Sequence, residues 1–332
     1  MLTSRLLPTL LAALLLAPTP LVLAQTPPQP KAAKAAAKKA APENPPVVKP
    51  TLAEVRYGPH ERHVLDFWRA PSATPTPVVF VIHGGGWQGG EKERVNKFVN
   101  VEGLLAQGIS VVAINYRLIK HAEAEGITPP VKAPLHDAAR ALQFVRSQAA
   151  AWNLDKTRIG AAGGSAGACS SLWLAYHDDL ADPKSGDPVA RESTRLFCAA
   201  VTGAQTTLDP VQMKSWTPNS KYGGHAFGLA NFAAFLDARD RLQPLIAEYS
   251  PYHLVSKDDP AVYLIYGTPP ALGRDEKDPT HTANFGVKLQ EYCRSLGVGC
   301  ELMYPGAKDV AHATAQDYLI TKLKSPARSA SR

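Results

Sequence analysis

The sequence is poor in cysteine. Four cysteines occur among 332 residues, and no Cys/His cluster has the spacing of a zinc site. Neither glycine-rich segment is followed by the Lys-Ser or Lys-Thr pair that completes a phosphate-binding loop. The sequence has no internal repeat, which excludes a solenoid. We therefore expect no metal and no cofactor, so the function should rest on amino-acid side chains and backbone groups.

The first 24 residues have the pattern of a secretory signal peptide. A short stretch with one positive charge, Met1–Arg5, precedes the apolar run Leu6–Ala17, which is too short to cross a bilayer as a helix. Small residues at Val22 and Ala24 predict cleavage after Ala24, the alternative being an uncleaved membrane anchor. We expect an exported protein, secreted or held in the periplasm or cell envelope, without a stable membrane span after cleavage.

The two ends of the chain carry its excess of positive charge. Residues 25–50 are rich in Lys, Ala and Pro without apolar periodicity, so we predict a disordered linker there and a disordered tail over 326–332. The whole chain has a formal net charge of +7, but the part between its lysine-rich ends comes to about −2. The basic character therefore belongs to the ends, and we expect no nucleic-acid partner.

Between these ends, β-type and helix-type stretches alternate over residues 51–325. Such alternation predicts an α/β fold, a mostly parallel twisted sheet with helices on both faces. Residues 209–256 break the rhythm and are predicted to form a cap-like insertion over the active site. The predicted strands are 52–57, 63–69, 78–82, 109–115, 158–162, 197–202, 262–266 and 300–304. The predicted helices are 94–107, 135–151, 166–177, 283–296 and one from 314, with a helical patch at 229–245 in the insertion.

The strongest catalytic motif is GGSAG at residues 163–167. A G-x-S-x-G directly after a strand and before a helix places a serine on a tight, strained turn, where its neighbours two positions away need almost no side chain. The helix that begins there directs its amide groups at developing negative charge. Ser165 is therefore the predicted nucleophile.

A second motif, HGGGW at residues 83–87, follows the predicted strand 78–82. Consecutive glycines allow backbone N–H groups to approach an oxyanion without side-chain obstruction. We predict that the amides of Gly85, Gly86 and Ala166 form the oxyanion hole. The order, oxyanion loop first and nucleophile later, is that of an α/β-hydrolase.

The same chain order places an acid after the nucleophile and a histidine last. His312 follows the predicted last strand and is the predicted base. His281 is its competitor, but it falls in the loop where the acid is expected. In that loop Asp278 is the predicted acid because the residues after it lead directly into a helix, and Asp275 is the alternative. The acid would fix the tautomer of the imidazole and stabilise its cation.

These motifs together resemble a known family. HGGGW, GGSAG, SPYHLVSKDDPAVYLIYG and YPGA followed by His312 are similar to the α/β-hydrolase esterases grouped as hormone-sensitive-lipase-like and acetyl/feruloyl-esterase-like, over about residues 52–324. The resemblance implies the α/β-hydrolase fold and ester hydrolysis through an acyl-enzyme, without a cofactor. Two features depart from it. Gly164 stands where the hormone-sensitive-lipase-like pattern has Asp, and the short turn before the acid is expanded to GTPPALGRDEKD.

We therefore expect a secreted serine carboxylesterase that acts on small acyl or aryl esters or on acylated carbohydrate. A peptidase on the same fold and a non-catalytic hydrolase-like binding protein are the alternatives. The sequence leaves open whether Cys293 and Cys300 form a disulfide, because spacing alone does not fix connectivity. It also leaves open whether the insertion aromatics Trp216, Tyr222 and Phe227 line a pocket or pack on the body. The oligomeric state is not predicted.

Overall fold

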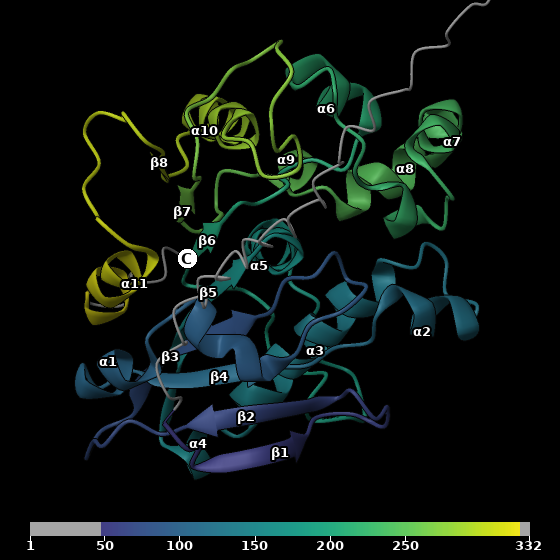
Figure 1. The fold of residues 1–332 in the computed structure, drawn as a ribbon. Helices are drawn as coiled ribbons and strands as arrows, with labels where there is room; N and C mark the ends of the chain where they lie inside the picture. Colours follow the sequence, from purple (N-terminus) through teal and green to yellow (C-terminus); the bar gives the residue numbers. More distant parts are fainter. Residues whose placement is uncertain (1–47, 326–332) are drawn as a thin grey trace, which may run out of the picture. The chain divides into compact units, whose positions relative to one another are not determined.

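One eight-stranded sheet organises the part of the chain that the computed structural model describes, residues 48–325 (Figure 1). The predicted signal peptide, nearly all of the predicted linker and the predicted tail lie outside these residues. The strands are β1 (Leu52–Arg56), β2 (Val64–Trp68), β3 (Thr76–Ile82), β4 (Ser110–Ile114), β5 (Leu154–Gly164), β6 (Cys198–Thr202), β7 (Val262–Ile265) and β8 (Cys300–Met303). Their order in the sheet is β1-β2-β4-β3-β5-β6-β7-β8. In the order of the sheet, β4, β3, β5, β6, β7 and β8 are parallel to one another. At one edge, β1 and β2 are added in antiparallel pairing.

The central strand β3 shows why the sheet is covered on both faces. All seven of its residues are buried. Val78, Phe80 and Ile82 face one apolar core, and Val79 and Val81 face a second one, as the period of two in a strand requires. Helices α3, α5 and α10 pack on the first face, and α1 and α11 on the second (Figure 1). A strand buried on both faces reads as a continuous apolar run, which confirms the prediction of a mostly parallel α/β sheet.

The predicted helices at 166–177, 283–296 and from 314 are confirmed to within about a residue, whereas the predicted stretches 94–107, 135–151 and 229–245 are each divided into two elements. The predicted helix over 94–107 is two elements, because the Asn100 side chain accepts a hydrogen bond from the Gly103 amide and starts a new helix there. The helical elements are η1 (Lys92–Lys97), α1 (Val101–Ala106), α2 (Ile119–Ala124), α3 (Lys132–Ser147), α4 (Ala149–Trp152), α5 (Ala166–Tyr176), α6 (Pro210–Trp216), η2 (Gly224–Phe227), α7 (Phe232–Asp237), α8 (Arg239–Tyr249), α9 (Pro251–Leu254), α10 (Asn284–Leu296) and α11 (Ala315–Lys324), where η marks a 3-10 helix.

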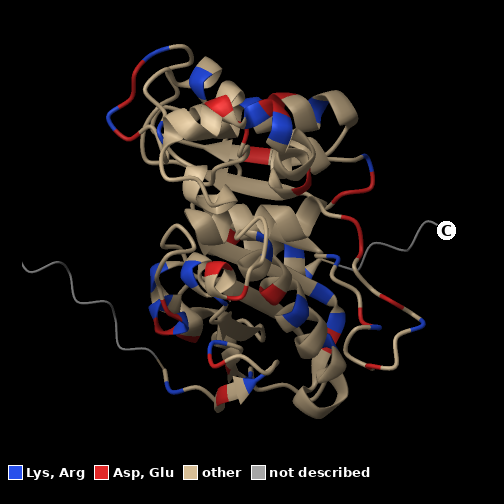
Figure 2. Ribbon diagram, turned by 90° about the vertical axis from the view of Figure 1, so that its right-hand side faces the viewer, with Lys and Arg blue, Asp and Glu red and all other residues tan. Residues whose placement is uncertain are grey.

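The described residues mix acidic and basic side chains. Both signs occur along the same helices and loops (Figure 2), for example in the Lys288–Glu291 pair on α10. Within residues 48–325, no helix combines the length and the apolar character that crossing a bilayer requires. All four cysteines are free thiols, and Cys293 lies 3.6 Å from the Tyr176 hydroxyl.

Candidate active site

Ser165 occupies a strained turn between β5 and α5. Its backbone has φ 54° and ψ −122°, a conformation that a residue with a side chain rarely adopts. The turn is possible because its flanking glycines leave no room for a Cβ. A Cβ on Gly163 would lie 2.6 Å from the Ile82 carbonyl oxygen, and one on Gly167 would lie 2.1 Å from the same atom. The spacing in GGSAG is therefore required by the close approach of this turn to β3.

The histidine beside Ser165 is His281. Its Nε2 lies 2.9 Å from Ser165 Oγ, and its Nδ1 lies 2.8 Å from Asp278 Oδ2. Asp278 Oδ1 also accepts hydrogen bonds from the amides of Thr280 and His281, at 3.2 and 3.3 Å. Partial burial alone would raise the pKa of Asp278, but the hydrogen bond and charge of His281 outweigh it and hold that pKa below its ordinary value. A hydroxyl, an imidazole and an ionised carboxylate thus form one hydrogen-bonded chain.

The structure contradicts the prediction that His312 lies beside Ser165. His312 Nδ1 is 2.7 Å from Glu301 Oε2 on β8, and its carbonyl oxygen accepts a 2.5 Å hydrogen bond from the Tyr263 hydroxyl on β7. Its ring packs edge-on against Tyr318 of α11, at a centroid distance of 5.2 Å. These contacts hold His312 beside the second apolar core, so it cannot reach Ser165. The prediction of His312 as the base is therefore wrong.

The loop between β7 and α10 carries both partners of the serine. Asp278 is placed as predicted, whereas the alternative acid Asp275 is exposed and upstream of the hydrogen-bonded group. The loop is fixed by Gln205, which is fully buried and donates a 2.7 Å hydrogen bond to the Thr280 carbonyl. The order Ser, Asp, His along the chain is thus kept, with His281 three residues after the acid instead of after the last strand. The sequence did contain a signal for the base, because His281 lies only three residues after Asp278 and can therefore contact it within one turn.

The HGGGW loop lies against the serine. A Cβ on Gly84 would be 2.5 Å from the Gly164 carbonyl oxygen, so only glycine permits this approach. Gly84 and Gly85 line the same cleft as Ser165, while Gly86 is one residue further and its carbonyl oxygen accepts a 3.0 Å hydrogen bond from His225 Nε2. The third predicted oxyanion donor, Ala166, is the first residue of α5, where amide groups lack partners within the helix. The structure therefore places Gly85 in the cleft and Ala166 directly after Ser165, whereas Gly86 does not line the cleft.

An open cleft of about 380 Å³ gives access to these groups. The lining residues are Gly84, Gly85, Arg94, Lys97, Phe98, Gly164, Ser165, Thr202, Gly203, Gly267, Asp278 and His281. None of these comes from the insertion over 209–256. One wall is formed by η1 and Phe98, and another by the loop that carries Asp278 and His281.

The insertion instead supports the catalytic loops from outside the cleft. His225 of η2 holds the glycine loop, and Asn219 exchanges two hydrogen bonds with the backbone of Glu276, at 2.8 and 3.1 Å. Trp216 packs edge-on against Phe285 of α10 at 6.0 Å, and Phe227 is also buried. Of the two interpretations of the insertion aromatics, the structure thus favours packing on the body for Trp216 and Phe227.

Phe98 explains the departure at Gly164. A Cβ on Gly164 would lie 2.7 Å from Phe98 Cε1, so the phenyl ring occupies the space that an aspartate side chain would need. A larger residue before the nucleophile would therefore require the Phe98 ring, which lines the cleft, to move.

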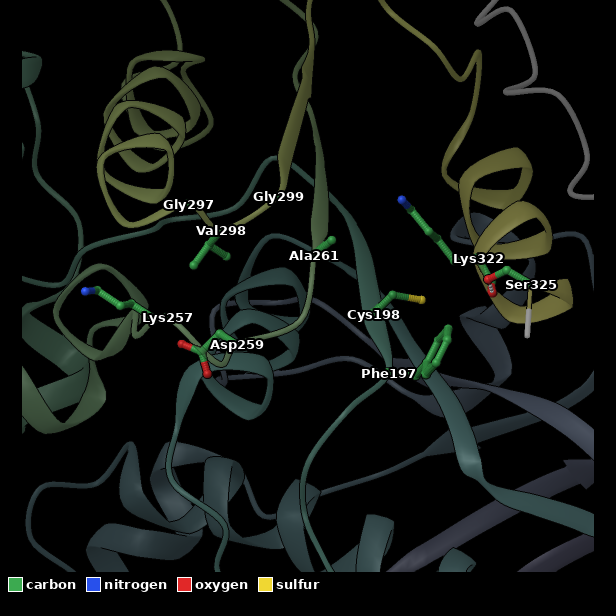
Figure 3. A pocket seen from close by; sticks show the side chains of 10 residues that line it. All are labelled: Phe197, Cys198, Lys257, Asp259, Ala261, Gly297, Val298, Gly299, Lys322 and Ser325. Carbon is green, nitrogen blue, oxygen red and sulfur yellow. Dashed lines mark hydrogen bonds between the residues drawn. The ribbon is translucent and has the colours of Figure 1, made fainter. Parts of the chain in front are cut away.

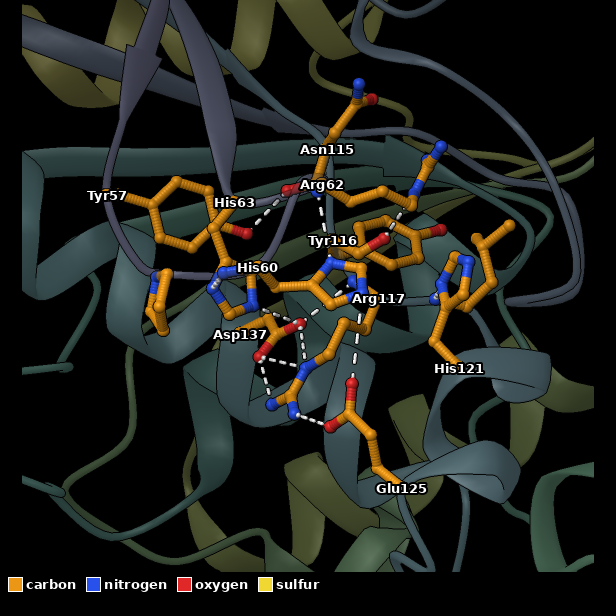
Figure 4. Close-up of polar contacts among 12 residues, drawn as sticks. Tyr57, His60, Arg62, His63, Asn115, Tyr116, Arg117, His121, Glu125 and Asp137 are labelled. Carbon is orange, nitrogen blue, oxygen red and sulfur yellow. Dashed lines mark hydrogen bonds and ion pairs between the residues drawn. The ribbon is translucent and has the colours of Figure 1, made fainter.

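A polar cluster separate from the Ser165 site joins the loop between β1 and β2 to helices α2 and α3 (Figure 4). Asp137, which is buried, accepts hydrogen bonds from Arg117 and pairs with His63 at 2.9 Å. The His60 and His121 rings are 5.0 Å apart, but the Nδ1 of each accepts a hydrogen bond from a backbone amide. Each neutral ring then carries its proton on Nε2, which leaves no free nitrogen lone pair for a metal. This cluster fits a structural network better than a metal site.

Another cavity, of about 310 Å³, lies where β6 begins and beside the residues that precede β7 and β8 (Figure 3). It is lined by Cys198, Asp259 and Lys322 among others. In open parallel sheets, ligands bind at the carboxyl ends of the strands, which is where Ser165 lies. The cavity in Figure 3 is at the opposite end of these strands.

Comparison with known proteins agrees with this geometry. A sequence model of the BD-FAE family matches residues 65–272. The carboxylesterase NlhH of Mycobacterium tuberculosis is 28% identical over 244 residues, which cover 71% of this chain, and the match spans 66% of the length of NlhH. The sequence resemblance to α/β-hydrolase esterases is thereby confirmed.

Solved structures share the fold. Thermogutta terrifontis esterase 2 phosphonylated by sarin has a TM-score of 0.59 and 21% identity, covering 83% of this chain and 92% of that one. The acetyl ester-xyloside bifunctional hydrolase from Caldicellulosiruptor lactoaceticus has a TM-score of 0.53 and 24% identity, covering 73% and 77% of the two chains. At these identities the likeness establishes the α/β-hydrolase fold.

Proposed function

This chain belongs to the BD-FAE family of α/β-hydrolase esterases, and we propose that it is an exported serine esterase that cleaves carboxylic esters through an acyl-enzyme. One observation carries the proposal: Ser165 Oγ lies 2.9 Å from His281 Nε2, whose other nitrogen lies 2.8 Å from Asp278. A nucleophile within hydrogen-bond reach of a base that a third group orients is the arrangement of covalent acyl transfer.

The proposed reaction has two steps. Ser165 Oγ attacks the ester carbonyl carbon while His281 Nε2 accepts its proton, and the alcohol leaves with that proton. Water then attacks the acyl-enzyme with His281 again as the base, which releases the acid and restores Ser165. Asp278 keeps the proton of His281 on Nδ1, so that Nε2 can accept. The amides of Gly85, Gly86 and Ala166 are the proposed donors to the oxyanion in both steps.

The proposed substrates are small acyl or aryl esters, with acylated carbohydrate as the physiological class. A carbohydrate esterase from gut microbiota and an acetyl ester-xyloside hydrolase are among the structures that share this fold. An extracellular substrate would follow from the proposed export, and the proposed cleavage after Ala24 would give a mature chain that starts at Gln25. N-terminal sequencing of the exported protein would test that cleavage.

A labelling experiment tests the function directly. The purified chain is expected to release 4-nitrophenol from 4-nitrophenyl acetate and to react with a fluorophosphonate probe, because the activated hydroxyl attacks phosphorus as it attacks a carbonyl. Peptide mapping should place the probe on Ser165. A chain that takes up no probe and cleaves no ester is a non-catalytic binding protein. Cleavage of peptide amides but not of esters would indicate a peptidase.

His225 is proposed as a positioning residue. Burial lowers the pKa of His225, so it is neutral and donates one N–H from Nε2 to the Gly86 carbonyl. His225→Ala should lower kcat by about tenfold and leave KM nearly unchanged, because the oxyanion amides matter more in the transition state than in substrate binding. His225→Gln, which can still donate a hydrogen bond, should recover part of the loss. An equal rise in KM for both variants would contradict a positioning role.

A further inference from the structure

The cleft beside Ser165 has a cationic wall. Arg94 and Lys97, both on η1, line it together with His281. Both side chains are exposed, and neither makes an ion pair with a carboxylate of residues 48–325. Lys92 on the same element is different, because it is buried and pairs with three carboxylates, those of Glu54, Asp66 and Glu93. Lys92 thus anchors η1 through its ion pairs, and Arg94 and Lys97 line the cleft.

Phe98 fixes this wall close to the reacting atoms. Its ring packs on the Gly164 position, next to Ser165, and Lys97 is its neighbour in sequence. The one acidic residue among the lining residues is Asp278, whose carboxylate already accepts hydrogen bonds from His281 and the Thr280 amide. Among residues 48–325, the cleft therefore offers two positive charges that pair with no carboxylate, against one carboxylate that already accepts hydrogen bonds.

From this arrangement we infer that the preferred substrates are esters that carry a carboxylate near the scissile bond. Arg in particular binds carboxylates with paired N–H groups, and Lys adds a point charge. The inference rests on the proposed esterase function and narrows its substrate class. The carboxylate can belong to the alcohol part, as in an acylated uronic acid, or to the acyl part, as in a half-ester of a dicarboxylic acid.

The expected preference is moderate. Ion pairs at exposed sites are each worth less than about tenfold, so two of them should raise kcat/KM for the charged substrate by roughly tenfold over its neutral counterpart. The preference should shrink in 0.5 M NaCl, since salt screens exposed charges.

Two matched substrate pairs measure the preference. An acetylated methyl glucuronoside against the acetylated methyl glucoside tests a carboxylate on the alcohol, and 4-nitrophenyl hemisuccinate against 4-nitrophenyl butyrate tests one on the acyl group. The R94Q/K97Q double variant should bring the charged-to-neutral ratio of kcat/KM to about 1. The matched control is K214Q/R241Q, which removes two exposed cations of the insertion that do not line the cleft. It should keep the wild-type ratio.

The outcomes separate the inference from the proposed function. The inference is supported if the charged ester of either pair is preferred by the wild type and by K214Q/R241Q but not by R94Q/K97Q. The pair that shows this preference identifies which part of the ester carries the carboxylate. Equal kcat/KM for charged and neutral members of both pairs overturns it while the esterase function stands. A preference that persists in R94Q/K97Q also overturns it. If none of the four esters is cleaved, the proposed esterase function itself is rejected.

Discussion

Ser165→Ala and His281→Ala should each lower kcat for 4-nitrophenyl acetate by about 10⁴-fold or more, and the double variant should be little worse than either one. The reason is that the hydroxyl and the imidazole act as a unit, since Ser165 Oγ and His281 Nε2 are 2.9 Å apart. Without the imidazole the hydroxyl keeps its proton, and without the hydroxyl the imidazole has no nucleophile to activate. Steady-state kinetics of the three variants, with thermal unfolding to show that each one folds, provides the measurement.

His312→Ala is the control for this prediction. His312 is held by Glu301 and the Tyr263 hydroxyl and has no contact with the cleft. Its loss should cost some stability at the β8 edge but leave kcat within about twofold of the wild type. If His312→Ala were inactive and His281→Ala active, the hydrogen-bonded chain described above would not be the catalytic one.

The sequence was sufficient to predict the sheet because the buried strands can be located from their apolar residues. VVFVI is a continuous apolar run and ISVVAIN is apolar except for Ser110 and Asn115, and both form central strands of the parallel sheet. The break at 98–100 was missed, since Asn100 caps a helix by a local hydrogen bond that apolar periodicity does not report. The nucleophile was found for the same reason as the strands, because GGSAG is a local steric requirement that can be read from neighbouring residues.

The base was misassigned because its position depends on how one loop folds. Chain order required a histidine after the acid, and both His281 and His312 meet that condition. Only the three-dimensional turn, fixed by the buried Gln205 and by the Asn219 bridge to Glu276, brings His281 beside the serine. The supporting role of the insertion was also hidden, because His225 acts through a hydrogen bond to a carbonyl 139 positions away in sequence.

Asp278→Asn should lower kcat by roughly 10²–10⁴-fold, and by more than Asp278→Ala does. The amides of Thr280 and His281 bind one oxygen at this position, at 3.2 and 3.3 Å, and they should hold the asparagine oxygen in the same place. The asparagine NH₂ group would then face His281 Nδ1 and donate to it. That hydrogen bond stabilises the tautomer with its proton on Nε2, which cannot accept the proton of Ser165.

Alanine at position 278 removes the carboxylate but imposes no tautomer. The side chain of Asp278 is 59% exposed, so water can reach Nδ1 in the alanine variant and part of the population keeps Nε2 free. Asp275→Asn is the matched control, because that exposed residue is the alternative acid in the same loop, and it should leave kcat within about twofold of the wild type. Kinetics of the three variants on one neutral ester decide the matter. A large loss in Asp275→Asn with an active Asp278→Asn would assign the acid to Asp275, and equal losses for asparagine and alanine at 278 would argue against control of the tautomer.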